Sequence, residues 1–597
     1  MFNKRPINRV DTLRIELASE YKEVLPLVAK LADSDEPVNT LLIDGTHGAD
    51  FEGFAAKLAA SLEERSIRTA IIRTRDYLRS GEELRQQFAE NITDNRAFGR
   101  VTASGTIADY FRPTAPDEWR EEKLKQGRLA SGAGGPLRII LLGPGARWLE
   151  GGRRPGVFLD VSRERQQRLY EGELLNFGLD ENEDALEKYK IAFFVEWPIV
   201  ERYRKEHLER FDFYVDMNDP ESPVATGTGE LLRLIAEAAS APMRVKPFFA
   251  PGVWGGQYLK RLAGLPEQWD NCAWCFEPIA PENSILLGSG EKTIEIPFTL
   301  VMNSAYRTVL GDRVSGLFGD FFPIRMNYLD TMGGSNLSVQ VHPKQEYIRE
   351  RFNYILEQQE SYYMMEQKPG SKVYLGLTES CTEERFLAAV ADAQMTGTPF
   401  DFTEYVQEWE CEKGDLFLIP TGTVHCSGSD NFVLEISATT WWFTFKLYDY
   451  VRPGLDGKPR PIDIGHAAPN IDWHKQTDWV GRELIARPAL LSRQGANEEY
   501  ALGRREDLLF YVNRIHLAEQ WTDDTRGEVL LLNLVEGQRV RLEPIAAPDK
   551  AVELDYAESY IVPAAVGAYR LINLGSAPAK LIKAGVSPQW ERAVAYE

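Results

Sequence analysis

Three polar side chains that could bind a metal ion stand at alternate positions in one short run. In "NLSVQVHPKQEY" (residues 336–347), apolar residues alternate with Ser338, Gln340 and His342. Such alternation is typical of a β-strand, in which successive side chains point to opposite faces. The run therefore predicts a strand with one polar face. That face could hold a cation, or Gln340 and His342 could form a hydrogen-bonded pair.

A further histidine follows a proline- and glycine-containing turn. "GDLFLIPTGTVHCSG" (residues 414–428) has the pattern G-x5-P-x-G-x2-H, which ends at His425. This pattern is similar to the second sequence motif of cupin barrels. An apolar strand ends in the turn, and the next strand would present His425 to the interior of the barrel.

An anionic ligand would complete a site made of two imidazoles and an amide. "LEQQESYYMMEQ" (residues 356–367) supplies Glu360, whose separation from His342 is close to the one cupins use. Two histidines, a glutamine and a glutamate suit zinc and leave room for water or substrate. The chemistry predicted is Lewis-acid catalysis on sugar oxygens.

The run after residue 246 resembles the class I mannose-6-phosphate isomerases. Four motifs stand in that family's order: "LSVQVHP", the "ESYYM" run at Glu360, "IPTGTVH" and "VLEIS…KLYDY". The similarity continues through "VWGG" (residues 253–256) and "SYIVPAAVGAYRL" (residues 559–571). The resemblance implies an all-β double-cupin (jelly-roll) isomerase with helical inserts. It also implies one zinc ion per chain, a sugar phosphate as substrate, and interconversion of mannose 6-phosphate and fructose 6-phosphate through a cis-enediol.

The resemblance also implies roles for individual residues. The implied metal ligands are Gln340, His342, Glu360 and His425, the implied substrate-binding residues are Ser338, Arg325 and Trp254, and the implied catalytic residues are Glu435 and Lys446.

The sequence departs from the family at three positions. Gln358 replaces a basic residue, Lys446 replaces an arginine, and Asn327 replaces a lysine for which Arg325 could substitute. Unlike an arginine, a buried lysine can lose its proton, so Lys446 is compatible with proton transfer. The loss of family cations keeps a second hypothesis open, that of a sugar-phosphate-binding sensor or regulator with weakened catalysis.

Residues 1–244 predict a different architecture, a mostly parallel sheet covered by helices. Short apolar runs such as "NTLLID" (residues 39–44) and "LRIILLG" (residues 137–143) alternate with helical patterns. The run "DGTHGADFEGF" resembles the phosphate-binding turn of uridine and nucleoside kinases. Phe51 and Glu52, however, occupy the positions of the lysine and the hydroxyl residue.

Three interpretations of this N-terminal region follow. It is a degenerate P-loop kinase-like domain with a structural or regulatory role, an unrelated α/β domain with a chance glycine turn, or an active kinase. Phe51 and Glu52 argue against the last, because a carboxylate repels polyphosphate.

Proline and glycine in residues 239–256 mark the predicted domain boundary. We expect a metal-binding cupin domain over residues 245–485 and a metal-free cupin domain over residues 486–597.

Composition limits the partners and the compartment. The net charge of −22 argues against binding nucleic acid or an anionic membrane surface. With five cysteines and neither a signal segment nor a membrane-length apolar run, the sequence predicts a cytoplasmic protein. Assembly into a homo-oligomer is compatible with the sequence.

Overall fold

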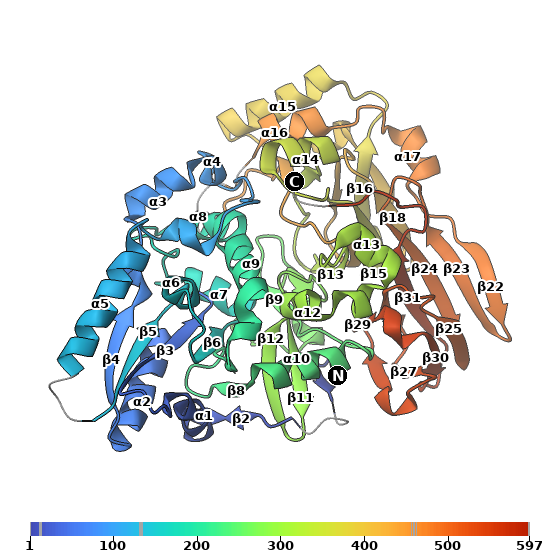
Figure 1. The fold of residues 1–597 in the computed structure, drawn as a ribbon. Coiled ribbons are helices and arrows are strands. Elements are labelled where there is room, and N and C mark those ends of the chain that lie inside the picture. Colours follow the sequence, from blue (N-terminus) through green and yellow to red (C-terminus); the bar gives the residue numbers. More distant parts are fainter. Residues whose placement is uncertain are drawn as a thin grey trace. The chain divides into compact units, whose positions relative to one another are not determined.

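The computed structural model describes residues 2–10, 15–130, 135–454, 457, 460 and 462–594. Within them the chain forms two compact units (Figure 1). The N-terminal unit comprises residues 7–238 and 284–304, and the second unit comprises residues 2–6, 239–283 and the chain from residue 305 onward.

The N-terminal unit is built on a seven-stranded sheet in the order β2-β8-β7-β6-β3-β5-β4. The strands are β2 (Ala18–Ser19), β3 (Val38–Gly45), β4 (Arg68–Arg73), β5 (Leu137–Leu142), β6 (Gly156–Asp160), β7 (Phe213–Asp216) and β8 (Val224–Gly227). The five from β3 to β7 run parallel, β8 pairs antiparallel with β7, and β2 pairs antiparallel with β8. The predicted mostly parallel sheet is thus confirmed.

Helices accompany this sheet and bury its apolar side chains. They are α1 (Glu20–Ala29), α2 (Phe51–Glu64), α3 (Gly81–Gln87), α4 (Ala89–Ile92), α5 (Ala115–Ala130), α6 (Ala146–Glu150), α7 (Arg163–Tyr170), α8 (Ala185–Ile191), α9 (Trp197–His207) and α10 (Thr228–Ala238). All six residues of β5 are buried, as its continuous apolar run predicts for a central parallel strand. Helix α2 packs Phe54 and Leu58 into the same core.

A short segment from later in the chain folds with the N-terminal unit. Strands β11 (Ser284–Ser289) and β12 (Lys292–Pro297) form a hairpin, and β1 (Ile7–Arg9) pairs with β11 in parallel. Helix α12 (Phe298–Leu310) follows and begins in this unit. The predicted boundary had assigned residues 284–304 to the second domain.

The first half of the second unit contains two antiparallel sheets. Their orders are β18-β15-β20-β13-β10-β9 and β17-β16-β19-β14-β21. The strands are β9 (Phe248–Ala250), β10 (Trp274–Phe276), β13 (Ile324–Asp330), β14 (Val339–Val341), β15 (Glu360–Gln367), β16 (Lys372–Leu377), β17 (Val406–Glu410), β18 (Leu416–Ile419), β19 (His425–Ser427), β20 (Asn431–Ala438) and β21 (Phe445–Tyr448).

The second half forms a sandwich of two further antiparallel sheets, in the orders β22-β23-β24-β31-β26-β29 and β25-β30-β27-β28. The strands are β22 (Ala489–Gln494), β23 (Asn497–Gly503), β24 (Phe510–Leu517), β25 (Gln520–Asp524), β26 (Leu530–Glu536), β27 (Arg539–Pro544), β28 (Val552–Asp555), β29 (Ser559–Val562), β30 (Ala568–Asn573) and β31 (Ala579–Val586). Side chains from both sheets share one core that includes Trp521, Leu532 and Tyr569.

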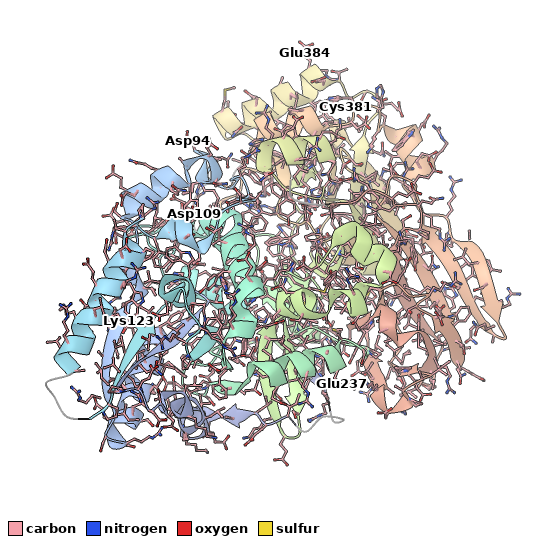
Figure 2. All side chains as sticks on the ribbon, in the orientation of Figure 1. Asp94, Asp109, Lys123, Glu237, Cys381 and Glu384 are labelled. Atoms are coloured by element: carbon pink, nitrogen blue, oxygen red, sulfur yellow. The ribbon has the colours of Figure 1, made fainter. Side chains whose placement is uncertain are left out.

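Helices interrupt the sheets of this unit, as predicted. They are α11 (Tyr258–Leu262), α13 (Asp312–Phe318), α14 (Gln345–Phe352), α15 (Glu383–Thr396), α16 (Ile464–Ala467) and α17 (Thr477–Glu483). Cys381 precedes α15 and Glu384 lies in its first turn (Figure 2). The N-cap Thr382 accepts a hydrogen bond from the Arg385 amide. Among the described residues, none of the helices has both the length and the apolar character needed to cross a bilayer.

Candidate metal centre

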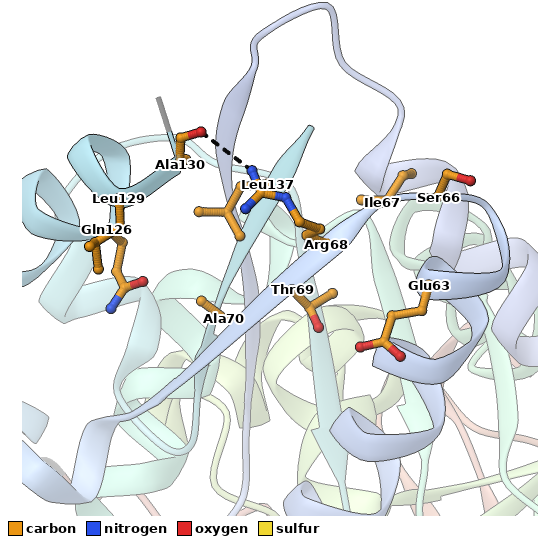
Figure 3. A pocket seen from close by; sticks show the side chains of 10 residues that line it. All are labelled: Glu63, Ser66, Ile67, Arg68, Thr69, Ala70, Gln126, Leu129, Ala130 and Leu137. Atoms are coloured by element: carbon orange, nitrogen blue, oxygen red, sulfur yellow. Dashed lines mark hydrogen bonds between the residues drawn. The ribbon is translucent and has the colours of Figure 1, made fainter. Parts of the chain in front are cut away.

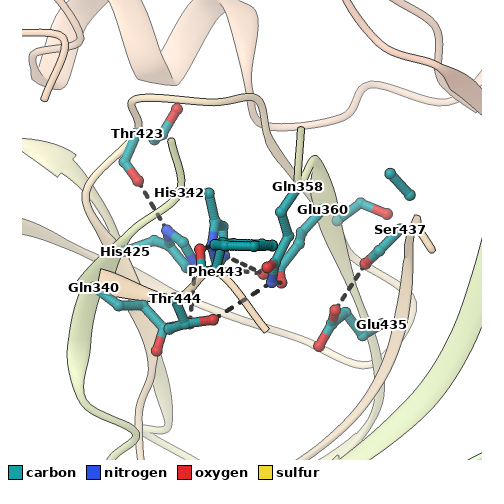
Figure 4. Close-up of polar contacts among 12 residues, drawn as sticks. Gln340, His342, Gln358, Glu360, Thr423, His425, Glu435, Ser437, Phe443 and Thr444 are labelled. Carbon is teal, nitrogen blue, oxygen red and sulfur yellow. Dashed lines mark hydrogen bonds and ion pairs between the residues drawn. The ribbon is translucent and has the colours of Figure 1, made fainter. Parts of the chain in front are cut away.

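Three strands from the two facing sheets bring the predicted ligands together (Figure 4). Gln340 on β14 pairs directly with His425, the first residue of β19. Glu360 begins β15 in the other sheet, and His342 follows β14. His342, Glu360 and His425 are all buried, with potential ligand atoms within 4.8 Å of one another.

Backbone carbonyls orient both imidazoles. His342 Nδ1 lies 3.2 Å from the Phe443 carbonyl, and His425 Nδ1 lies 2.8 Å from the Thr423 carbonyl. A carbonyl can only accept, so each Nδ1 carries the proton and donates it, which leaves a lone pair on each Nε2. Burial lowers the pKa of His425, which favours the neutral ring that a metal requires.

The two Nε2 atoms face one carboxylate oxygen. Glu360 Oε2 lies 3.1 Å from His342 Nε2 and 3.4 Å from His425 Nε2. His342 Nε2 and Glu360 Oε2 are buried and have no hydrogen-bond partner among the residues that the structure describes. Convergent lone pairs without a shared proton are costly unless a cation lies between them, so this donor set fits zinc.

The environment keeps Glu360 ionised. Burial by itself would raise the pKa of Glu360, but electrostatic interactions with its surroundings, including the charge of Arg325, hold it well below its usual range. Gln358 donates to Glu360 Oε1 over 2.6 Å. Position 358, where the family has a cation, thus contributes a neutral hydrogen bond to the same carboxylate.

Gln340 lies at the edge of this group. Its Nε2 is 3.3 Å from His425 Nε2, and its Oε1 accepts from Ser338 Oγ over 3.1 Å. A half-turn of the amide would present Oε1 to a metal and Nε2 to the serine hydroxyl, which can also accept. Ser338, predicted to contact substrate, therefore lies beside a candidate ligand.

Arg325 on β13 joins two carboxylates. Its guanidinium lies 3.1 Å from Glu360 Oε1 and 2.6 Å from Glu435 Oε1. Ser437 and Asn327 also donate to Glu435. Burial raises the pKa of Glu435 to about 7, against the opposing effect of Arg325. A carboxylate with that pKa can exchange protons at neutral pH.

Lys446 on β21 pairs with Gln340 across the strands and so shares its face. Burial, followed by the charge of Arg460, lowers the pKa of Lys446 to about 8. Arg452 and Arg460 each lie 2.6 Å from the buried Asp449. Sequence reasoning missed these two arginines; their signal was the occurrence of two arginines within the proline- and glycine-containing segment that follows the strand carrying Lys446.

The described contacts of Trp254 are not with the side chains of the candidate metal centre. Its ring packs edge-on against Trp274, with centroids 4.6 Å apart, and is 3% exposed. The described contacts of Trp254 are thus those of a core residue, and its predicted contact with substrate stays a prediction.

The glycine-rich loop after β3 uses its own amides internally. The Thr46 amide donates to the Leu159 carbonyl, and the Ala49 amide donates to the Thr46 carbonyl. Further along, the Phe51 amide donates to the Ala49 carbonyl and the Gly53 amide to the Asp50 side chain. In a phosphate-binding loop such amides point to the ligand instead. Arg73 binds Glu52 over 2.6 Å, and Gln166 donates to the His47 carbonyl.

A pocket of about 460 Å³ in the same unit lies elsewhere (Figure 3). Arg68 and Leu137, at the amino ends of β4 and β5, contribute to its lining. Ligands of open parallel sheets bind beyond the carboxyl ends of the strands, where the glycine-rich loop lies. This pocket therefore lies at the wrong edge for a nucleotide site of that kind.

Comparison with known proteins finds two kinds of similarity. Residues 21–240 match a family described as a domain of unknown function, DUF8485. ManA, a mannose-6-phosphate isomerase of Bacillus subtilis (strain 168), is 27% identical over 308 residues, which are 50% of this chain and 86% of the relative. The probable mannose-6-phosphate isomerase GmuF of the same organism is 27% identical over 240 residues, 39% of this chain and 70% of the relative.

Among solved structures, the chain is similar to the mannose 6-phosphate isomerase of Bacillus subtilis, with 20% sequence identity and a TM-score of 0.47. The superposition includes 58% of this chain and 100% of the Bacillus chain. About half of this chain is thus similar in sequence to proteins described as mannose-6-phosphate isomerases. The kinase-like interpretation of the N-terminal unit stays a prediction.

Proposed function

We propose that this chain is a metal-dependent aldose-ketose isomerase that interconverts mannose 6-phosphate and fructose 6-phosphate. The observation that carries the proposal is the convergence of His342 Nε2, His425 Nε2 and Glu360 Oε2 in a chain homologous to mannose-6-phosphate isomerases. With Gln340 as the fourth ligand, the site would hold one zinc ion per chain.

Bound zinc would supply Lewis-acid polarisation of the sugar carbonyl. Glu435 would remove the proton from C2 of mannose 6-phosphate and return it to C1, the former carbonyl carbon, while the C2 hydroxyl proton passes to the C1 oxygen, through a cis-enediol. Its pKa of about 7 suits both steps, because the carboxylate must accept a proton and then release it. Arg325, bonded to Glu360 and Glu435, would hold both carboxylates in place.

Three cationic side chains could bind the phosphate of the substrate. Lys446, Arg452 and Arg460 lie near two carboxylates, Asp449 and Asp463, which leaves a net positive charge. Arg325 was predicted to bind the phosphate, but two carboxylates already share its charge. We therefore assign the phosphate to Lys446, Arg452 and Arg460, with Ser338 as a further hydrogen-bond donor.

The direct test is coupled detection of fructose 6-phosphate formed from mannose 6-phosphate by zinc-loaded protein, with His425→Ala as the inactive control. Turnover by the parent protein alone supports the proposal. A zinc-loaded protein that binds mannose 6-phosphate without forming product contradicts it. That result would favour the sensor hypothesis, which rests on the replacement of family cations by Gln358 and Lys446.

The pH dependence of kcat/KM should be bell-shaped. Glu435 accepts a proton only when ionised, so activity rises with pH through about 7. Lys446 holds phosphate only when protonated, so KM rises above about 8. Lys446→Arg cannot lose its charge, and we expect it to abolish the alkaline fall while kcat at pH 7 stays within about tenfold. A fall in kcat at constant KM above pH 8 would instead place Lys446 in proton transfer.

The N-terminal unit is expected not to bind Mg-ATP. Four of its loop amides donate to oxygens of the protein itself, and Glu52 is paired with Arg73. Titration calorimetry of the full chain with Mg-ATP should give no binding heat up to millimolar concentration. Stoichiometric binding that Glu52→Ala strengthens would contradict the loss of the phosphate site.

A further inference from the structure

The turn of residues 420–423 connects both histidines of the metal centre. The Gly422 amide donates to the His342 carbonyl over 3.0 Å, and the Thr423 carbonyl accepts from His425 Nδ1 over 2.8 Å. Gly422 has φ +78, and a Cβ there would lie 2.9 Å from the Asn470 carbonyl oxygen. The turn is therefore constrained in conformation, and any shift in it moves His425.

Lys475 holds this turn from outside the barrel. Its Nζ donates to the Thr421 carbonyl over 2.6 Å and to Thr423 Oγ1 over 3.1 Å. Thr423 Oγ1 in turn donates to the Pro420 carbonyl over 2.6 Å. One ammonium group thus fixes two points of the turn whose carbonyl orients His425 (Figure 4 shows the Thr423–His425 contact).

The burial of Lys475 is costly without such a role. The residue is 7% exposed and lines a pocket of about 570 Å³. Burial lowers its pKa to about 8, and its nearest carboxylate, Asp472, lies 4.0 Å away. A lysine held this far from its counter-charge is stabilised mainly by the turn oxygens that it binds.

We propose that Lys475 is a positioning residue of the metal centre, which fixes the Nδ1–H tautomer and the orientation of His425 through the turn of residues 420–423. The inference rests on the proposed metal centre and adds a residue to it from outside the barrel. Partners one step removed from a metal ligand typically change metal affinity by about 10–100-fold when they are replaced.

Lys475→Met removes the ammonium group and keeps an unbranched chain. We expect zinc affinity, measured by competition with a chromogenic chelator, to fall by about tenfold, at the lower end of the range for direct partners of a ligand, because Lys475 acts through Thr423. In the zinc-free protein, the NMR nitrogen shifts of His425 should change from those of a single Nδ1–H tautomer to those of a mixture.

Lys344→Met is the matched control, because Lys344 lines the same pocket but is exposed. The zinc affinity of this variant should stay within about twofold of the parent value.

Thr423→Val gives a second test that keeps side-chain shape, for use if Lys475→Met does not fold. It removes the hydroxyl that Lys475 binds and should weaken zinc by about tenfold, while Thr423→Ser should behave as the parent. Folded Lys475→Met or Thr423→Val protein with parental zinc affinity and an unchanged His425 tautomer would overturn the role of Lys475. Failure of the parent protein to bind zinc would instead overturn the metal centre itself.

Discussion

Replacement of Glu360 by glutamine is expected to remove the bound zinc. The carboxylate is the one anionic group among the four proposed ligands, and its Oε2 faces both Nε2 atoms. Two unit charges about 4 Å apart interact by about 4 kcal/mol at an effective dielectric of about 20, so loss of the carboxylate charge beside a dication should weaken binding by at least on the order of 10³-fold. Metal analysis after dialysis should find one zinc per parent chain and none in Glu360→Gln.

The fold should survive this change. The new amide can donate to a histidine Nε2 and accept from Arg325, so the buried groups keep partners. Glu366→Gln is the control, because Glu366 lies on the same strand and binds Lys413 instead. Full zinc content in Glu360→Gln, with a circular dichroism spectrum like that of the parent, would contradict the assignment of this ligand.

Replacement of Glu435 by glutamine is expected to lower kcat by about 10³-fold, within the range typical of a general base. Zinc content should stay unchanged, because Glu435 contacts Arg325, Asn327 and Ser437 rather than the histidines. KM for mannose 6-phosphate should change little, since the phosphate contacts come from other residues. The acidic limb of the pH profile near 7 should disappear with the base.

Steady-state kinetics of zinc-loaded Glu435→Gln separate this role from structural support. A variant that keeps kcat within tenfold of the parent, or that loses zinc, would show that Glu435 supports the site without moving the proton. Glu435→Asp should retain part of kcat, because the shorter carboxylate can still accept a proton at reduced reach.

Much of the metal centre could be predicted because its geometry is periodic and local. Alternation in a strand places Gln340 and His342 on one face, and the turn before His425 carries a recognisable pattern. The spacing of Glu360 came from the resemblance to cupins, and the structure places it opposite both histidines. The pairing of Gln340 with His425 is non-local, yet β-sheet register follows directly from these buried faces.

Contacts made by irregular segments could not be predicted in this way. Arg452 and Arg460 meet at Asp449 through a loop, and Lys475 reaches the turn of residues 420–423 from beyond the end of the barrel. No periodicity governs such positions, so their partners depend on how the whole chain folds.

The division into units shows the same limit. Residues 284–297 form strands, as their apolar pattern suggests, but their partners lie far away in the chain. β1 pairs with β11, and the Glu295 amide on β12 donates to Asp216 over 2.8 Å. Composition places a boundary at a proline- and glycine-rich stretch, but it carries no information about a hairpin that returns to the preceding unit.

The most direct test of the metal centre is an X-ray structure of zinc-loaded protein with anomalous data collected at the zinc edge. We predict a single strong peak about 2.0–2.2 Å from His342 Nε2, His425 Nε2 and Glu360 Oε2, with the Gln340 amide oxygen turned towards it. A zinc-loaded crystal whose anomalous peak lies away from these side chains would contradict the account.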